Sequence, residues 1–264
     1  MIPPLVFNLP VGKKVYFASD FHLGVPNKQA SLLREKKIIE WLESIEKDAE
    51  LIILAGDIFD FWFEYKYTVP KGFTRILGKL ANLTDRGLKI IAFTGNHDMW
   101  MFDYLEEELN IPVYRTPQIF IINNKRFLVG HGDGLGPGDK FYKVLKKIFR
   151  NRLCIKLFGF IHPDFGMYIA NSWSRKSRIS QLNKEVYHGE QEWLLQYCKQ
   201  VEQTEHFDYY IFGHRHLPLD IKVSDKSRYI NLGEWINFYT YAVFDGSEVN
   251  LLTYDQCKIE KNTI

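Results

Sequence analysis

The sequence contains 264 residues, 46% of them hydrophobic and 25% charged, which are the proportions of a soluble globular protein that buries a full core. Its three cysteines, Cys154, Cys198 and Cys257, are too few and too scattered for a disulfide framework or a zinc knuckle. The first residues lack signal-peptide features, and no run approaches the roughly 18 apolar residues of a spanning helix, so we expect a cytoplasmic protein.

The formal net charge of +2 is unevenly distributed along the chain. Residues 133–180 hold ten Lys or Arg against three Asp, a net of +7, which leaves −5 for the rest of the chain. Such a basic segment favours an anionic partner, namely phosphate, nucleic acid or a lipid surface. Its cations alternate with aliphatic and aromatic residues at helical spacing, which suits a lipid interface better than a nucleic-acid groove. We therefore expect no nucleic-acid partner and no obligate protein partner.

Apolar runs typical of strands recur along the chain, each followed by polar and glycine-rich residues; they cover 13–19, 49–56, 88–95, 125–132 and 207–214. Segments with helical periodicity separate the first three runs, with apolar residues from Leu32 to Ile45 and from Phe73 to Leu83. The order strand, helix, strand, helix, strand indicates an α/β protein with a partly parallel sheet.

After Ile111 the pattern changes to short strands with tight connections, such as the hairpin expected at Asn123-Asn124 and the strands expected in the C-terminal third. We interpret these as a second, mostly antiparallel sheet. The prediction is a mixed α/β (α+β) fold, a four-layer α-β-β-α sandwich of two mixed sheets. Residues 1–264 are expected to form one domain, with 138–180 inserted as a helical cap.

Side chains that bind metals follow each of the five main strand runs. They are Asp20 and His22; Asp57 and Asp60; Asn96, His97 and Asp98; His131 and Asp133; and His214 and His216. Open α/β sheets bind ligands at the carboxyl edge of their strands. Each of these residues taken singly fits a helix cap or a turn, but five such groups in series, in a chain with only eight His, indicate a shared site.

Mixed carboxylate, amide and imidazole ligands suit borderline divalent ions such as Mn, Fe, Zn or Co. Because the set contains no cysteine, a structural zinc site is not expected. Two ions about 3.5–4 Å apart clamp a phosphoryl group and lower the pKa of a bridging water. The pattern therefore predicts a two-metal hydrolytic centre.

The series D-x-H, G-D-x-x-D, G-N-H-D, G-H-G-D and G-H-x-H resembles that of the calcineurin-like metallophosphoesterases over most of the chain. The resemblance implies that Asp20, His22 and His216 hold the first metal, that Asn96, His131 and His214 hold the second, and that Asp57 bridges the two. It further implies two catalytic residues, His97, which faces the substrate, and Asp98, which orients it. Two divalent ions, with Mn foremost, are the implied cofactors.

Within that superfamily the sequence most resembles the UDP-2,3-diacylglucosamine hydrolases of lipid A synthesis, through "HGDGLGPGDKFY" and the basic insert containing "ANSWSRKSR". This implies cleavage of a nucleotide-linked glycolipid to UMP and 2,3-diacylglucosamine 1-phosphate by a metal-bound hydroxide. It also implies peripheral binding to the anionic cytoplasmic face of the inner membrane through the cap. The implied substrate-binding residues are Asn96, His97, Asp139, Tyr142 and Ser172, and the basic residues Arg175, Lys176 and Arg178 are added as candidate phosphate contacts.

Two other interpretations stay open at this point. The chain departs from the best-known branch of these hydrolases at His97, where that branch has Arg, and in the basic pattern from Trp173 to Arg178. A phosphodiesterase or phosphatase acting on another nucleotide or phospholipid is therefore an alternative. An alternative of another class is a membrane-binding scaffold with a vestigial metal site.

Overall fold

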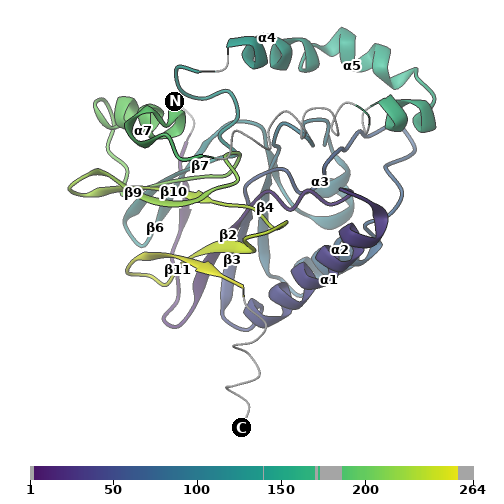
Figure 1. The fold of residues 1–264 in the computed structure, drawn as a ribbon. Coiled ribbons are helices and arrows are strands. Elements are labelled where there is room, and N and C mark those ends of the chain that lie inside the picture. The colour runs from purple at the N-terminus through teal and green to yellow at the C-terminus, as the bar shows by residue number, and fades with distance from the viewer. Residues whose placement is uncertain (1–2, 139, 170–171, 173–185, 255–264) are drawn as a thin grey trace.

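The structure is a computed structural model that describes residues 3–138, 140–169, 172 and 186–254. Two six-stranded mixed sheets lie face to face (Figure 1). The first sheet, in spatial order, consists of β12 (Val249–Thr253), β11 (Thr240–Phe244), β2 (Lys14–Ala18), β3 (Ala49–Leu54), β4 (Lys89–Phe93) and β5 (Val113–Tyr114). The second sheet consists of β1 (Leu5–Phe7), β6 (Gln118–Ile122), β7 (Lys125–Val129), β8 (Tyr209–Phe212), β10 (Ser227–Leu232) and β9 (Pro218–Ser224).

Helices cover the outer face of each sheet, as expected for an α-β-β-α sandwich. Helices α1 (Lys28–Ile45), α2 (Thr74–Asp85) and α3 (Tyr104–Leu109) contribute to the hydrophobic cluster on the outer face of the first sheet. Helix α7 (Trp193–Glu202), preceded by the short 3-10 helix η1 (Gly189–Gln191), packs on the second sheet. The expected fold class is thus confirmed.

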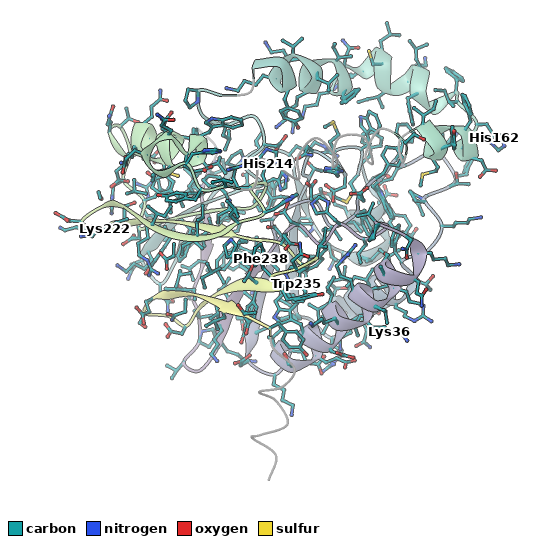
Figure 2. The ribbon with its side chains drawn as sticks, in the orientation of Figure 1. Lys36, His162, His214, Lys222, Trp235 and Phe238 are labelled. Atoms are coloured by element: carbon teal, nitrogen blue, oxygen red, sulfur yellow. The ribbon has the colours of Figure 1, made fainter. Side chains whose placement is uncertain are left out.

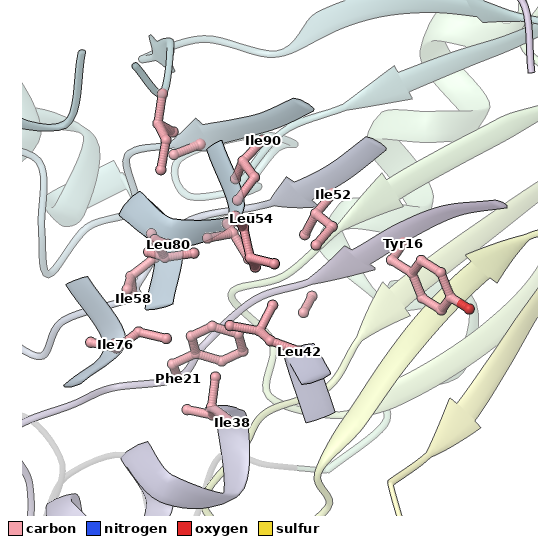
Figure 3. Packing of buried hydrophobic residues seen from close by; sticks show 14 of the residues in the cluster. Tyr16, Phe21, Ile38, Leu42, Ile52, Leu54, Ile58, Ile76, Leu80 and Ile90 are labelled. Carbon is pink, nitrogen blue, oxygen red and sulfur yellow. The ribbon is translucent and has the colours of Figure 1, made fainter. Parts of the chain in front are cut away.

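The packing between layers follows from the alternation of side chains along the strands. Ile52 and Leu54 of β3 point to the helices and pack with Leu42 of α1 and Leu80 of α2 (Figure 3). The intervening residue Ile53 points to the other face and belongs to the cluster between the two sheets. From Leu51 to Leu54 β3 is buried on both faces, and this part of the strand is entirely apolar, as central parallel strands are.

The connectivity of the second sheet differs from the expected antiparallel arrangement. Strand β8 pairs in parallel with both β7 and β10, and β1 pairs in parallel with β6. Strands β11 and β12 join the edge of the first sheet, where β11 runs antiparallel to β2. The long chain between β7 and β8 permits this parallel pairing, because parallel neighbours need a crossover connection. The expected hairpin does form between β6 and β7, with Asn123 and Asn124 at positive φ.

The segment between β7 and β8 includes helices outside the sandwich. Helices α4 (Lys140–Phe149) and α5 (Arg152–Gly159) extend over the body and are followed by a further helical stretch at 163–169 (Figure 1). The chain turns between α4 and α5 at Asn151, whose side chain accepts hydrogen bonds from the backbone N–H of Leu153 and Cys154 and so caps α5. Among the described residues, no helix has the length and apolar character needed to cross a membrane.

Candidate metal centre

Five loops bring the predicted metal ligands to one place. They follow β2, β3 and β4 of the first sheet and β7 and β8 of the second. Strands β2, β3 and β4 are parallel neighbours, so their carboxyl ends share one edge, and β7 and β8 do the same in the second sheet. His214, after β8, lies on the side of the body that faces α4 and α5 (Figure 2).

The first group of ligand atoms comes from Asp20, His22, Asp57 and His216, whose side chains each offer one atom within 4.8 Å of the others. The Nε2 atoms of His22 and His216 face one another at 3.0 Å, and Nε2 of His216 lies 3.3 Å from Oδ1 of Asp20. Two imidazole nitrogens and two carboxylates converging in this way form a donor set suited to a divalent cation.

The second group is joined to the first through Asp57. Oδ2 of Asp57 lies 3.2 Å from Nε2 of His131, and Oδ1 of Asn96 lies 3.1 Å from the same nitrogen. Oδ1 of Asn96 is also 2.8 Å from Nδ1 of His214. The structure thus places Asp57 between the two histidine-containing groups, as a bridging ligand requires.

Several buried ligand atoms have no hydrogen-bond partner. They are Oδ1 of Asp20, Nδ1 of His22 and Oδ2 of Asp57. A buried polar atom without a partner costs about 1–3 kcal/mol, and more for a charged group. Two of the three atoms belong to carboxylates that point into the donor cluster, so bound cations would offset this cost. The donor set therefore fits two divalent ions.

The backbone conformation at the predicted ligands also indicates a functional site. Ten described residues other than glycine have positive φ, and half of them are predicted ligands: Asp20, His22, Asp57, His214 and His216. Each such residue costs on the order of 1–3 kcal/mol and persists only where its surroundings enforce it. Concentrated strain of this kind is characteristic of functional sites.

Electrostatics in the cluster depend on its two inner histidines. Burial lowers the pKa of His214 to about 3, and the neighbouring His131 adds to the effect, so His214 is neutral as a metal ligand must be. Burial opposes the charging of His131, but the carboxylates of Asp57, Asp20 and Asp133 together outweigh burial and raise the pKa of His131 to about 10. Without an ion, a proton on His131 therefore balances part of the carboxylate charge, which is the role a cation would take over.

Close packing around Asp57 requires glycine at position 95. A Cβ there would collide with the carboxylate of Asp57 and would lie 2.7 Å from its backbone nitrogen. The backbone N–H of His97 donates to Oδ1 of Asp57 at 2.8 Å, which holds the loop after β4 against the bridging carboxylate. Gly95 and His97 therefore hold Asp57 in position, and Asn96 between them supplies a predicted ligand.

The surroundings of His97 involve Asp60 in addition to the residues expected from the sequence. Nδ1 of His97 lies 3.0 Å from the carbonyl oxygen of Asp60 and 3.5 Å from its Oδ1. The carboxylate of Asp98 accepts hydrogen bonds from the backbone N–H groups of Ile58 at 2.8 Å and Gly95 at 2.7 Å. Asp98 therefore links the loops after β3 and β4. Asp60 lies beside Nδ1 of the His97 ring, and the orienting role expected for Asp98 stays a prediction.

The predicted residues of the cap divide into two groups. Tyr142 donates to Oδ2 of Asp133 at 2.6 Å, and its ring centroid lies 6.3 Å from that of His214, so it borders the metal centre. Ser172 is exposed and donates to the carbonyl oxygen of Tyr168 at 2.7 Å. Four predicted residues lie outside the described residues: Asp139, Arg175, Lys176 and Arg178.

Supporting residues were missed because their partners are distant in the sequence. Buried Arg34 of α1 donates to the carbonyl oxygens of His22 at 2.6 Å and Val25 at 2.5 Å, which fixes the loop after β2. Arg215, between the two ligands of the last motif, pairs at 2.6 Å with buried Glu192 at the start of α7.

Comparisons with known proteins identify a family and several similar chains. The model of the family described as calcineurin-like phosphoesterase matches residues 13–218. A protein from Porphyromonas gingivalis named UDP-2,3-diacylglucosamine hydrolase is 39% identical over 252 residues, covering 90% of this chain and 96% of that protein. A protein of the same name from Histophilus somni is 24% identical, with 84% and 92% covered. The solved structure of Yfce, a phosphoesterase from E. coli, is 16% identical, with 91% of this chain and 92% of that chain covered and a TM-score of 0.46.

Proposed function

This chain belongs to the calcineurin-like phosphoesterase family, and on that basis we propose that it hydrolyses the pyrophosphate bond of UDP-2,3-diacylglucosamine. The products are UMP and 2,3-diacylglucosamine 1-phosphate. The observation that carries the proposal is that the seven predicted metal ligands form two groups that meet at Asp57, in a chain 39% identical to a hydrolase of that name.

Asp20, His22 and His216 are proposed to hold one divalent ion, and Asn96, His131 and His214 the other, with Asp57 between them. Manganese is the foremost candidate, and Fe, Zn or Co also suit these ligands. When bound, such a pair of ions supplies an activated water and neutralises phosphoryl charge. The backbone N–H of His97 donates to the Asp57 carboxylate and would hold it in position for both ions.

His97 is proposed to act on the phosphoryl group or the leaving oxygen. Its Nδ1 lies within hydrogen-bond distance of the Asp60 carbonyl oxygen, so proton exchange with the substrate is left to Nε2. A ring fixed in this way donates to charge that develops in the transition state without reorganising first. Asp60 thus acts as a positioning residue, and Asp98 preserves the geometry of the loops.

The cap is proposed to receive the acyl chains and to contact the membrane. Its exposed apolar side chains include Leu153, Leu157, Phe160 and Phe165, which are 58–77% exposed. The lysines and arginines interspersed with them suit an anionic leaflet. We propose that residues 1–264 are one domain, that 138–180 form its cap, and that the protein binds peripherally to the cytoplasmic face of the inner membrane.

A product assay tests this function. The purified protein, with added Mn and with EDTA as control, is incubated with UDP-2,3-diacylglucosamine, UDP-N-acetylglucosamine and bis(4-nitrophenyl) phosphate. Metal-dependent UMP release from the acylated substrate but not from UDP-N-acetylglucosamine is the expected result. Hydrolysis of the aryl diester without action on the lipid would overturn the substrate and favour another phosphodiesterase. A protein inactive on all three, with no affinity for metal, would favour the scaffold.

A further inference from the structure

A cavity of about 570 Å³ adjoins the metal centre beneath α4. His131 and Gly132 form its wall on the metal side, and the ends of β4 and of the chain before β6 contribute Thr94, Thr116 and Pro117. This volume lies within the range of small-molecule sites and exceeds what a single phosphate ion needs. The cavity is therefore large enough for a nucleotide-sized group beside the predicted ions.

The cavity is strongly basic. Five cations line it, Arg115, Lys143, Lys146, Lys147 and Arg150, together with a single carboxylate, Asp133. Lys146 pairs with Asp133 at 2.5 Å. In the part of the chain that the structure describes, none of the other four cations has a carboxylate within ion-pair distance, and Arg115 and Arg150 donate to backbone carbonyl oxygens instead. Like charges gathered without counterions repel each other, so an anionic ligand would stabilise this wall.

Helix α4 and the residue after it line the cavity with basic side chains, while part of its apolar surface stays exposed. Lys143, Lys146, Lys147 and Arg150 have the spacing of one helix face and line the cavity. Val144 and Ile148 lie elsewhere on the helix and are 58% and 48% exposed. A helix that gains stability only by packing would bury the apolar side. Phe149 packs against Trp100, but packing does not account for the basic residues along the cavity, which remain within reach of an anionic ligand from solvent.

A neutral hydrogen-bonding group completes the site. The side chain of Thr94 lines the cavity and is 3% exposed, and its buried hydroxyl has no hydrogen-bond partner. Such a group carries a desolvation cost that a ligand hydroxyl or phosphate oxygen would offset. Thr94 lies at the end of β4, two residues before the predicted ligand Asn96, so a group bonded to it lies next to the metal centre.

We propose that this cavity is the binding site for the nucleoside monophosphate part of the substrate, an inference that rests on the proposed function. The phosphoryl group at the ions would be joined to a ribose and base extending under α4. The basic face of α4 balances the charge of the diphosphate, and Thr94 offers a hydrogen bond. The acyl chains lie on the other side of the reacting phosphorus, toward the exposed apolar residues of α5 and 163–169.

Equilibrium binding of UMP to the Mn-loaded full-length protein tests the inference, with uridine and inorganic phosphate as companion probes. Lys147→Glu and Arg150→Glu are each expected to weaken UMP binding by about tenfold or more. Lys156→Glu, on α5 and outside the cavity, is the matched control and is expected to leave UMP binding within twofold of wild type. Thermal unfolding of each variant verifies that it is folded.

Thr94→Val tests the site a second way, because a purely structural role of Thr94 would change stability and not UMP affinity alone. Removing a hydroxyl without a partner leaves the melting temperature unchanged or higher, while UMP affinity falls about three- to tenfold. Equal UMP affinity in all three cavity variants and wild type would overturn the site. Binding of phosphate as tight as that of UMP would overturn the nucleotide assignment. Neither result bears on lipid hydrolysis, which the product assay decides separately.

Discussion

The ligand loops of the sandwich and the helices of the cap are built in opposite ways. The predicted ligands are buried or half-buried, those after β2, β3 and β8 include strained backbone, and Arg34 and Asp98 brace the loops that carry several of them. The described part of the cap packs on the body through contacts such as Phe158 against Trp100 and Tyr142 against Asp133, yet it leaves many apolar side chains exposed. The difference supports the proposed division of roles, in which the braced loops hold the reacting groups and the cap receives the acyl chains.

The largest effect is expected where the ligand loops meet. Asp57→Ala removes the carboxylate shared by both ligand groups, so turnover of bis(4-nitrophenyl) phosphate should fall by about 10³-fold or more. Bound metal, measured by elemental analysis, should fall with it. Asp225→Ala, at an exposed position, is the control. Near-normal turnover in folded Asp57→Ala protein would refute the assignment of Asp57 as the bridging ligand.

The second prediction tests the close packing around Asp57 without removing any ligand. Gly95→Ala retains every ligand but places a Cβ against Asp57, so the activity should fall by about 10²-fold or more because the carboxylate must move. Gly78→Ala makes the same change in the exposed part of α2, where nothing lies within 4 Å. It should raise the free energy of unfolding by up to about 1 kcal/mol and leave activity unchanged. Equal activity in both variants would contradict the tight packing.

A third experiment distinguishes the roles of His97 and Asp98. His97→Ala should lower kcat by about 10²-fold and change the free energy of unfolding by no more than about 0.5 kcal/mol. Asp98→Ala should lower the free energy of unfolding by about 2–4 kcal/mol, because backbone N–H groups in two loops lose their acceptor. Chemical denaturation and steady-state kinetics measure both effects. An Asp98→Ala protein of full stability but low activity would support direct orientation of His97 by Asp98.

The smallest effect is expected in the cap and should depend on the substrate. Leu157→Asp places a charge among exposed apolar residues, so KM for the acylated substrate should rise by about tenfold. Hydrolysis of bis(4-nitrophenyl) phosphate, which has no acyl chain, should not change. Val11→Asp, fully exposed outside the cap, is the control for added charge. A rise in KM for both substrates would contradict the proposal that the loops hold the reacting groups and the cap binds the acyl chains.

Local sequence patterns predict the layers of the fold and a candidate set of metal ligands. Runs such as 49–56, apolar on both faces, can only be central strands, and motifs at successive strand ends share one edge because parallel strands align. These are local patterns with a fixed geometric consequence. Asp20, Asn96 and His214 were therefore identified before any contact between them was known.

Contacts between segments that are distant in the sequence fix which residues support the site. They also fix which side of α4 lies against the cavity. Asp60 rather than Asp98 lies beside Nδ1 of His97, since a turn between β3 and α2 sets that contact across 37 residues of sequence. The pairing of β11 with β2 and of β8 with β7 likewise depends on long-range packing, which alternation alone leaves undetermined. Helical spacing in α4 defines a basic and an apolar face, but only its position over the body places the basic one against the cavity.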